Sequence, residues 1–396
     1  MDFDPPESVR PLLEKIERFI HDVVIPAEAG VFAKGFIEGA PLLDDLRKKC
    51  KQAGLWGPQL PKELGGLGLS LVEHGLVSEK LGWSPIGHYV FGAQAPDAGN
   101  MEILHKYGTA AQKERWLEPL ARGEIRSCFS MTEPENPGSN PTLLSCRAVR
   151  DGDHYVIDGH KWFTSSADGA AFAIVMAVTN PDGPPHARAS MIIVPTDTAG
   201  FERARNIKIM GDAGEGWASH AEIWYRNVRV PIDNRLGAEG SGFLIAQERL
   251  GPGRIHHCMR WIGICERVFD TLCRHITQRK IDNEKTLATR QIAQAWVAEA
   301  RAEIDASRLM VLHAAWTIEK KGFSNARDQV SLIKFYVADV MLRLVDRAIQ
   351  LHGALGITSD TVLAHYYVHE RGARIYDGPD EVHKMVVAKR ILARYS

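Results

Sequence analysis

Residues 143–166 read LLSCRAVRDGDHYVIDGHKWFTSS, and this stretch decides the fold class of the chain. Two Asp-Gly pairs, Asp151-Gly152 and Asp158-Gly159, separate short runs in which apolar and polar residues alternate. Alternation with a period of two is typical of strands with one buried face, and Asp-Gly favours tight hairpin turns. The stretch therefore predicts antiparallel β-structure.

The strand signal extends on both sides of this stretch, from residue 126 to residue 236. The segments AFAIVMAVTN, ASMIIVPTD and HAEIWYRNVRVP are rich in β-branched and aromatic residues. Turn signals recur roughly every ten residues, a spacing that suits a small antiparallel barrel or sandwich. We therefore expect one central β-domain over residues 126–236.

Helical periodicity flanks this β-region on both sides. PLLDDLRKKCKQAGLWG repeats apolar residues at helical spacing and stops at Gly54, a common residue after a helix end. After residue 237, long amphipathic segments predict a bundle, with GFLIAQERL and IHHCMRWIGICERVFDTLCRHITQR as separate helices. The predicted class is mixed α and β, mainly α, with an N-terminal α-helical domain at 1–125, the β-domain at 126–236 and a helical bundle at 237–396.

Composition excludes several classes of protein. The 396 residues carry a net charge of −1, so no strong field favours nucleic acid as a partner. The sequence contains no uninterrupted run of about 18 apolar residues, so no membrane span is predicted. The six cysteines are scattered without a CxxC pair, which indicates reduced thiols rather than a disulfide framework or zinc ribbon. The first residues show neither a signal nor a transit peptide, so a cytoplasmic location is expected.

The common catalytic and nucleotide motifs are absent from the sequence. There is no G-x-G-x-x-G, no P-loop and no G-x-S-x-G elbow. His365 and His369 stand four apart, as two zinc ligands on a helix would, but no third ligand is evident, so no metal site is predicted. His256 and His257 are adjacent and therefore face different sides of a helix, which favours a structural role.

Two segments contain residues that could bind a ligand or act in catalysis, and each also allows a purely structural interpretation. SCFSMTEPENPGSN, residues 127–140, breaks into a loop of hydroxyls, prolines and free amides that suits a flat, polar-edged ligand, or else is a surface connection. RIYDGPDEVH, residues 374–383, contains Asp377, which is either a cap for the last helix or a catalytic base. Proline and acids at the start of a helix favour the capping interpretation when these ten residues are taken alone.

The order of motifs along the whole chain resembles the acyl-CoA dehydrogenase family of flavoproteins, in the branch with an aspartate base. The matching segments are YGTAAQKERWLEPLARGEI, CFSMTEP, IDGHKWFTSSA, NVRVP, GPGRIHHCMR, AIQLHGALGIT and RIYDGPDEVH. The resemblance implies an α-helical N-terminal domain, a central β-domain and a C-terminal four-helix bundle. It also implies FAD, bound partly by a second subunit of a dimer or tetramer, an acyl-CoA substrate and electron-transferring flavoprotein as the electron acceptor.

The resemblance further implies which residues form the site. The implied cofactor-binding residues are Phe129, Met131, Thr132, Gly138, Ser139, Phe163, Thr164, Ser165, Arg279, Gln350, Leu351, His352, Gly353, Ala354, Pro379 and Glu381. The implied substrate-binding residues are Ser139, Arg254, Tyr376 and Gly378. Phe163 replaces the usual tryptophan of the family and Ser165 the usual threonine, and a plain core aromatic is the alternative for Phe163. Arg279 lacks the family's R-x-x-F-G pattern, so a surface arginine is its alternative.

Asp377 matches the catalytic carboxylate of the family. Some relatives place the base one residue before an arginine on the first bundle helix, but Gly253 stands there and carries no carboxylate. The resemblance implies that Asp377 takes the α-proton of the thioester while a β-hydride leaves to flavin N5, which gives a trans-2-enoyl-CoA. Alternatives on the same scaffold are an acyl-CoA oxidase, a flavin monooxygenase or a flavin-free binding protein.

Overall fold

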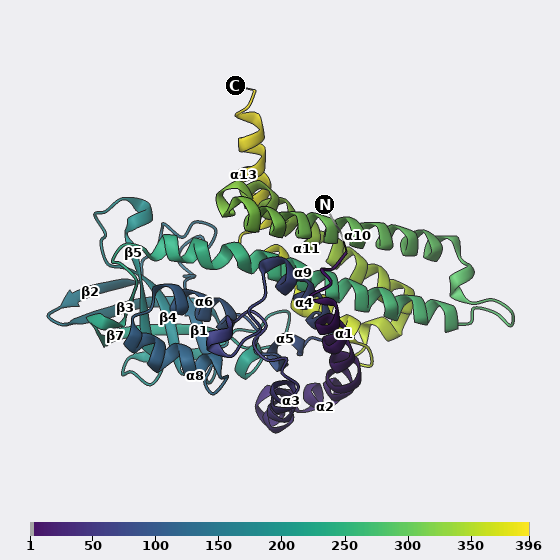
Figure 1. Cartoon of the computed structure of the whole chain (residues 1–396), viewed down its shortest axis with the longest axis horizontal. Coiled ribbons are helices and arrows are strands. Elements are labelled where there is room, and N and C mark those ends of the chain that lie inside the picture. Colours follow the sequence, from purple (N-terminus) through teal and green to yellow (C-terminus); the bar gives the residue numbers. More distant parts are fainter. Residues whose placement is uncertain (1–3, 396) are drawn as a thin grey trace. The chain divides into compact units, whose positions relative to one another are not determined.

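The computed structural model describes residues 4–395, apart from the side chain of residue 252, and the chain divides into two compact units. Unit 1 consists of Met1–Ile25, Leu69–His88 and Gly251–Ser396, and unit 2 of Pro26–Gly68 and Tyr89–Leu250. Each unit combines segments that are distant in the sequence. The elements of both are labelled in Figure 1.

Unit 2 is built on one eight-stranded sheet. Its strands run in the order β6-β7-β3-β2-β4-β5-β8, and β1 pairs in parallel with β4. The turn predicted at Asp151-Gly152 is present between the antiparallel strands β2 and β3. The turn predicted at Asp158-Gly159 is wrong, because both residues lie inside β3, where its pairing with β7 only shifts register. The strand bounds are Ser127–Ser130 (β1), Arg147–Asp151 (β2), His154–Ser165 (β3), Phe172–Val178 (β4), Ala189–Pro195 (β5), Phe201–Asn206 (β6), His220–Pro231 (β7) and Arg235–Leu236 (β8).

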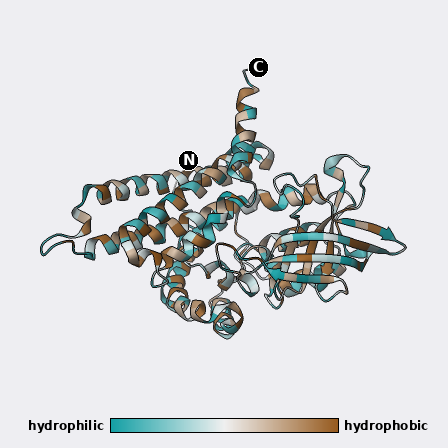
Figure 2. Ribbon diagram, turned by 180° about the vertical axis from the view of Figure 1, so that it is seen from behind, coloured by the Kyte–Doolittle hydropathy of each residue, from teal (hydrophilic) through white to brown (hydrophobic). Residues whose placement is uncertain are grey.

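Strands β4 and β5 are apolar on both faces, because each face covers a separate core. Phe172, Ile174 and Met176 of β4 pack with apolar residues of the helices in unit 2. The intervening residues of β4, among them Val175, pack instead with side chains of β3 and β7. A sheet whose strands share a core with one another has curled over itself, as in a barrel or sandwich. In Figure 2 the ribbon of the sheet carries both brown, apolar segments and teal, polar ones.

Helices of unit 2 surround this sheet within the same unit. Helix α3 ends where the sequence predicts, because Gly54 adopts φ +67 and the N–H of Leu55 bonds back to the carbonyl of Cys50 at 3.1 Å. The helical segments are Glu28–Glu38 (α2), Ala40–Gln52 (α3), Asp97–Tyr107 (α6), Ala110–Gln112 (α7), Lys113–Leu117 (η4) and Glu118–Ala121 (α8).

Unit 1 is a bundle of long helices. The prediction of two helices around residues 251–253 is wrong, since α9 runs through them as one helix. Gly251 is needed there because an added Cβ would lie 2.7 Å from the ring of Phe323. The helices are Arg10–Phe19 (α1), Leu71–Leu81 (α4), Gly242–Gln278 (α9, of which unit 1 holds the part from Gly251), Gln291–Lys321 (α10), Arg327–His352 (α11), Val362–Glu370 (α12), Arg371–Arg374 (η11) and Asp380–Leu392 (α13).

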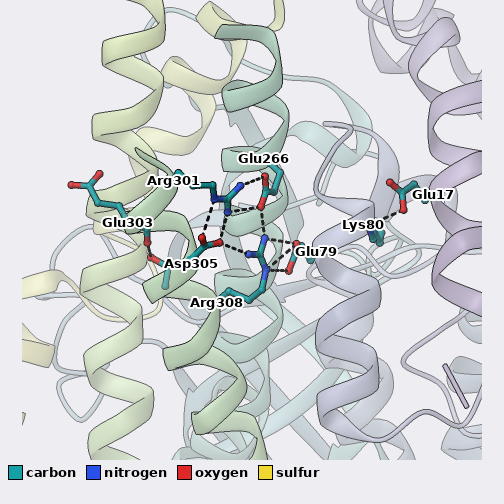
Figure 3. Close-up of polar contacts among 9 residues, drawn as sticks. Glu17, Glu79, Lys80, Glu266, Arg301, Glu303, Asp305 and Arg308 are labelled. Atoms are coloured by element: carbon teal, nitrogen blue, oxygen red, sulfur yellow. Dashed lines mark hydrogen bonds and ion pairs between the residues drawn. The ribbon is translucent and has the colours of Figure 1, made fainter. Parts of the chain in front are cut away.

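Three helices of unit 1 are joined by a network of ion pairs, which Figure 3 shows. Arg308 on α10 donates to Glu79 on α4, at 2.8 Å from Nη2, and to Glu266 on α9. Arg301, two turns earlier on α10, forms a second bidentate pair with Glu266. Both glutamates are largely buried, so the arginines compensate charges that could not otherwise leave water.

The architecture confirms the predicted mixed α and β class with helical, β and helical regions in sequence order. The boundaries at 125/126 and 236/237 stay predictions, because the two compact units combine segments from several parts of the chain. All six cysteines are free. None of the helices in residues 4–395 is long and apolar enough to cross a membrane.

Candidate active site

Asp377 lies in the turn between η11 and α13, and it does not cap α13. The helix begins at Asp380 with Pro379 in the N-cap position, and no side chain makes a capping hydrogen bond there. Asp377 adopts φ +54, a left-handed conformation that non-glycine residues rarely take. The side chain of Asp377 is 21% exposed, so its carboxylate is partly shielded but open on one side.

The main-chain carbonyl of Asp377 is held by two side chains. Arg254 on α9 donates to it from Nε at 3.2 Å and from Nη2 at 3.0 Å. Nε2 of His383 on α13 donates to the same oxygen at 3.1 Å. Lys334 on α11 donates to the carbonyl oxygen of Gly378 at 2.9 Å. Donors from three helices thus fix the left-handed turn and offset its conformational cost, which is about 1–3 kcal/mol.

The predicted substrate residues of unit 1 come together around this turn. Gly378 adopts φ +98, and an added Cβ would lie 2.7 Å from Nε2 of His383, so only glycine fits. The hydroxyl of Tyr376 accepts a hydrogen bond from Arg260 at 3.1 Å. That guanidinium also forms a bidentate pair with Glu370 at 2.5 and 2.8 Å. Arg254, Tyr376 and Gly378 are therefore neighbours of Asp377, and their role in substrate binding stays a prediction.

Burial sets the charge of the histidines in this region. Nε2 of His257 lies 3.4 Å from Oδ2 of Asp377. Burial lowers the pKa of His257 to about 4, and it lowers the pKa of His383 to about 4 as well. Burial also lowers the pKa of Lys334. His256 faces a different side of α9, where its ring centre lies 3.9 Å from that of His74 with the two rings tilted by 47°, as the adjacency of the two histidines predicts.

The predicted flavin loop starts at β1 in unit 2. The guanidinium of Arg249 lies 4.2 Å from the ring centre of Phe129. Thr132 accepts a main-chain hydrogen bond from Trp162 of β3 at 3.0 Å, so the loop runs beside the KWFTS segment. Met131, Thr132 and Gly138 line one small hollow inside the loop. Ser139 is exposed and is not among the residues that line this hollow.

A buried ion pair gives this loop its shape. The ammonium of Lys161 donates to Oε1 of Glu133 at 2.9 Å and to the carbonyl of Met131 at 2.8 Å. Glu133 also accepts from the N–H groups of Ser145 and Cys146 at 2.6 and 2.9 Å. Although burial opposes it, these contacts hold the pKa of Glu133 below its ordinary value. The loop is therefore a fixed structure rather than a loose surface connection.

Phe163 sits on an irregularity of β3 that turns its ring outward. The pairing of β3 with β7 shifts register between Lys161 and Thr164, and Phe163 between them adopts φ +48. Its side chain is 42% exposed, so it is not a core aromatic. Ser165 hydrogen-bonds Nδ1 of His220 at 2.8 Å, while the buried hydroxyl of Thr164 pairs with Ser130 at 3.0 Å and faces away from solvent.

The predicted residues for the partner subunit's cofactor meet at one end of unit 1. The ring of His352 stacks on that of His275 at 3.9 Å, and its Nδ1 donates to a carbonyl of its own helix. The stack brings the ends of α9 and α11 together, and these ends carry Arg279 and the segment 350–354. Gly353 ends α11 with φ +61, and Arg279 is exposed. Pro379 and Glu381 lie apart from them, at the start of α13.

Family models cover nearly the whole chain. Residues 6–124 match the N-terminal domain of acyl-CoA dehydrogenases, residues 128–228 the middle domain and residues 240–392 the C-terminal domain. The chain belongs to the acyl-CoA dehydrogenase family. In the described part of the chain, no group of three or more His, Cys, Asp or Glu side chains could hold a metal ion.

Individual acyl-CoA dehydrogenases are similar over the full length of this chain. FadE2 of Mycobacterium tuberculosis is 44% identical over 89% of this chain and 86% of its own. Acyl-CoA dehydrogenase family member 11 of Mus musculus is 40% identical over 96% of this chain, which spans 49% of that longer protein. A solved acyl-CoA dehydrogenase structure from Mycobacterium abscessus superposes with a TM-score of 0.94 at 40% identity, covering 99% of this chain and 100% of that one.

Sequence reasoning missed the residues that organise the site. Lys161 carried a usable signal, because it occupies an inward-facing position of an alternating strand and a buried lysine needs a partner. Glu133, its partner, stands in the loop that the sequence does single out. His257, Lys334 and His383 carried no comparable signal, since each contacts the Asp377 turn from a different helix.

Proposed function

We propose that the protein catalyses the FAD-dependent α,β-dehydrogenation of an acyl-CoA thioester to a trans-2-enoyl-CoA, with Asp377 as the base. The observation that carries this proposal is the geometry of the Asp377 turn. The carboxylate makes no helix cap, and its main chain is held in a strained conformation by Arg254 and His383. Strain that several donors maintain is typical of positions with a function.

The same turn supplies two groups that the reaction requires. The carboxylate of Asp377 takes the α-proton as a general base. Within the described residues, the main-chain N–H of Asp377 has no hydrogen-bond acceptor, so it is free to donate to a thioester carbonyl. A donor at that oxygen stabilises the negative charge that develops as the proton leaves. Asp377 thus has two roles in this proposal. Its carboxylate removes the α-proton, and its main-chain N–H polarises the thioester carbonyl, which makes that proton more acidic.

The residues of unit 2 fit a flavin. The outward ring of Phe163 offers an aromatic face, and the hydroxyls of Thr132 and Ser165 suit the polar edge of an isoalloxazine ring. The buried Nε1 of Trp162, next to Phe163, has no acceptor among the described residues. FAD, when bound, supplies the hydride acceptor of the reaction. We assign its contacts to the residues predicted from the sequence, with Thr164 contributing no side-chain contact because its hydroxyl is buried against Ser130.

A second copy of the chain and an electron-transferring flavoprotein complete the proposal. Leu355 and Ile357 directly follow the segment 350–354 and are 40% and 72% exposed. Apolar side chains at such exposure beside a predicted cofactor contact favour coverage by another subunit. We therefore propose a dimer or tetramer, which light scattering tests. Reduction of electron-transferring flavoprotein, rather than of oxygen, is the proposed outlet for the electrons.

Anaerobic bleaching of the flavin by a panel of acyl-CoAs tests the function. We expect purified protein to be yellow and to bleach with at least one acyl-CoA. Asp377→Asn keeps FAD and loses bleaching, by at least about 10³-fold, because the base is removed. Asp360→Asn, the same change at an exposed loop position of unit 1, leaves bleaching intact. A fully active Asp377→Asn variant contradicts the assignment of the base, and peroxide release in air indicates an oxidase or monooxygenase outlet instead.

A further inference from the structure

The donors around Asp377 are divided between its main chain and its carboxylate. Arg254 and His383 donate to the main-chain carbonyl, and Lys334 donates to the carbonyls of Ala373 and Gly378. Among the described residues, the side-chain nitrogen within 4 Å of the carboxylate belongs to His257, whose Nε2 lies 3.4 Å from Oδ2. Arg254 and Lys334 therefore fix the main chain of the turn. Among the described residues, His257 is the side chain whose nitrogen contacts the carboxylate of Asp377.

The imidazole of His257 is held in one place by aromatic rings. It lies one helical turn before Trp261 on α9, and the two rings are nearly parallel, at 26° and 6.1 Å between centres. The ring of Tyr376 packs on it at 5.5 Å. Trp261 is fully buried, so it cannot move aside. Packing on two sides holds Nε2 at 3.4 Å from Oδ2 of the carboxylate.

The charged and titratable groups facing His257 come from every element packed around it. They are His256 and Arg260 on α9, Lys334 on α11, Glu370 on α12, His88 on α5 (Gly87–Val90), Tyr376 and Asp377 itself. Arg260 is neutralised by its bidentate pair with Glu370. Burial outweighs the attraction of Asp377 and keeps the pKa of His257 at about 4, so the ring is neutral near pH 7.

A neutral imidazole carries one N–H, and its position follows from the contact. An unprotonated Nε2 would place its lone pair against an ionised oxygen, whereas an Nε2–H donates to it. We propose that His257 is a positioning residue for the base: its Nε2–H donates to the Asp377 carboxylate and holds it in the orientation that meets the α-proton. This inference depends on the proposed function of Asp377, and it adds a second side chain to that site.

Two substitutions separate a hydrogen bond from simple space filling. His257→Leu keeps apolar bulk and removes the donor, while His257→Gln retains an amide N–H near the position of Nε2. We expect the leucine variant to bleach about tenfold more slowly at neutral pH, and the acid limb of its rate–pH profile to move up by about one unit, the effect of one hydrogen bond to the charged form. The glutamine variant returns to within about threefold of wild type.

The measurement is stopped-flow bleaching of the holoenzyme between about pH 5 and pH 9, with acyl-CoA affinity determined in parallel. His313→Leu, an exposed histidine on α10, is the matched control and keeps the wild-type profile. A wild-type profile for His257→Leu overturns the inference, and so does a glutamine variant as slow as the leucine variant. If wild type bleaches with no acyl-CoA, the proposed function fails instead, and the two failures are thus distinguishable.

A spectroscopic readout is independent of turnover. In 15N-labelled holoenzyme, the signal that disappears in His257→Gln identifies His257, and we expect a neutral ring protonated at Nε2 at pH 6. A ring protonated at Nδ1 overturns the inference. If His257→Leu loses FAD, His257→Asn is measured in its place, because an asparagine amide is too short to reach Oδ2 of Asp377. We expect the acid limb of the rate–pH profile to shift upward in His257→Asn as well. An acid limb at the wild-type position in that variant overturns the inference.

Discussion

Replacement of Lys161 by methionine tests whether a buried ion pair holds the predicted flavin loop. The Lys161 side chain has no exposed surface, and its three N–H groups are all used. They donate to the carbonyl of Met131 at 2.8 Å, to Oε1 of Glu133 at 2.9 Å and to the carbonyl of Met176 on β4 at 2.8 Å. Methionine fills most of the same volume but carries neither the charge nor the donors.

The expected loss follows from what remains buried. Glu133 is 1% exposed, so its charge stays in the interior without a cation. Breaking one side of a buried pair costs about 3–5 kcal/mol. Glu133 keeps the main-chain donors of Ser145 and Cys146, and it keeps the amide of Asn136 at 2.6 Å. We therefore expect the lower end, about 3 kcal/mol, which is a large share of a stability that totals about 5–15 kcal/mol.

The assay is equilibrium unfolding in urea followed by tryptophan fluorescence, since Trp162 adjoins the mutated residue. Hydrogen exchange at the amides of Ser145 and Cys146 reports the loop itself. The double variant Lys161→Met/Glu133→Gln recovers about 1–2 kcal/mol relative to the single variant, because no unpaired charge remains. Lys208→Met, an exposed lysine in unit 2, leaves the unfolding midpoint unchanged.

Two results refute this reasoning. A loss below about 1 kcal/mol in Lys161→Met means that the pair contributes no more than one ordinary hydrogen bond. A double variant that is less stable than Lys161→Met means that the unpaired carboxylate is not the source of the loss. In either case the shape of the loop depends on its prolines and main-chain contacts rather than on Glu133.

Three further predictions follow from other contacts. Gly378→Ala places a Cβ 2.7 Å from His383 at φ +98, so we expect a loss of about 1–3 kcal/mol in thermal unfolding and slower bleaching. Arg308→Met leaves the buried carboxylates of Glu79 and Glu266 without this arginine (Figure 3), so we expect the free energy of unfolding in urea to fall by about 3 kcal/mol. Arg274→Met, at an exposed position, leaves the urea midpoint unchanged. Because folding lowers the pKa of Glu133, its carboxylate stabilises the folded protein at pH values above the ordinary glutamate pKa of about 4.3. This stabilisation disappears as the pH falls through the lower pKa of the folded state, and we expect Glu133→Gln to lack this loss in acid unfolding curves.

Local sequence patterns were sufficient for the elements and insufficient for two junctions. Alternation and the turn at Asp151-Gly152 predicted β2 and β3, and Gly54 predicted the end of α3, because each depends on a few neighbouring residues. The turn predicted at Asp158-Gly159 is absent, because pairing with β7 keeps these residues inside β3. The continuous helix α9 was not predictable, since proline and glycine at residues 251–253 disfavour a helix locally. Packing against Phe323 is a long-range contact that no local pattern carries.

In the candidate site, too, some features could be predicted from the sequence and others depend on long-range contacts. Asp377 stood out through the order of motifs, yet its ten local residues favoured a helix cap. The structure removes that alternative, because the helix begins after Pro379 without a side-chain cap. What holds Asp377 comes from α9, α11 and α13, through Arg254, Lys334 and His383. Arg254 is 123 residues from Asp377, and Lys334 is 44 residues from Gly378, so no periodic signal in the sequence links these partners to the turn.

Two residues of the predicted site, Asp377 and Phe163, share a backbone conformation that costs each of them about 1–2 kcal/mol. In both cases neighbouring donors offset the cost. The carbonyl of Asp377 accepts from Arg254 and His383, and each such bond contributes about 1 kcal/mol. Phe163 lies between Lys161 and Thr164, which are both buried and hydrogen-bonded. Fixed flanks leave the residue between them no relaxed alternative, so each residue keeps its left-handed conformation, which leaves Phe163 42% and the Asp377 side chain 21% exposed.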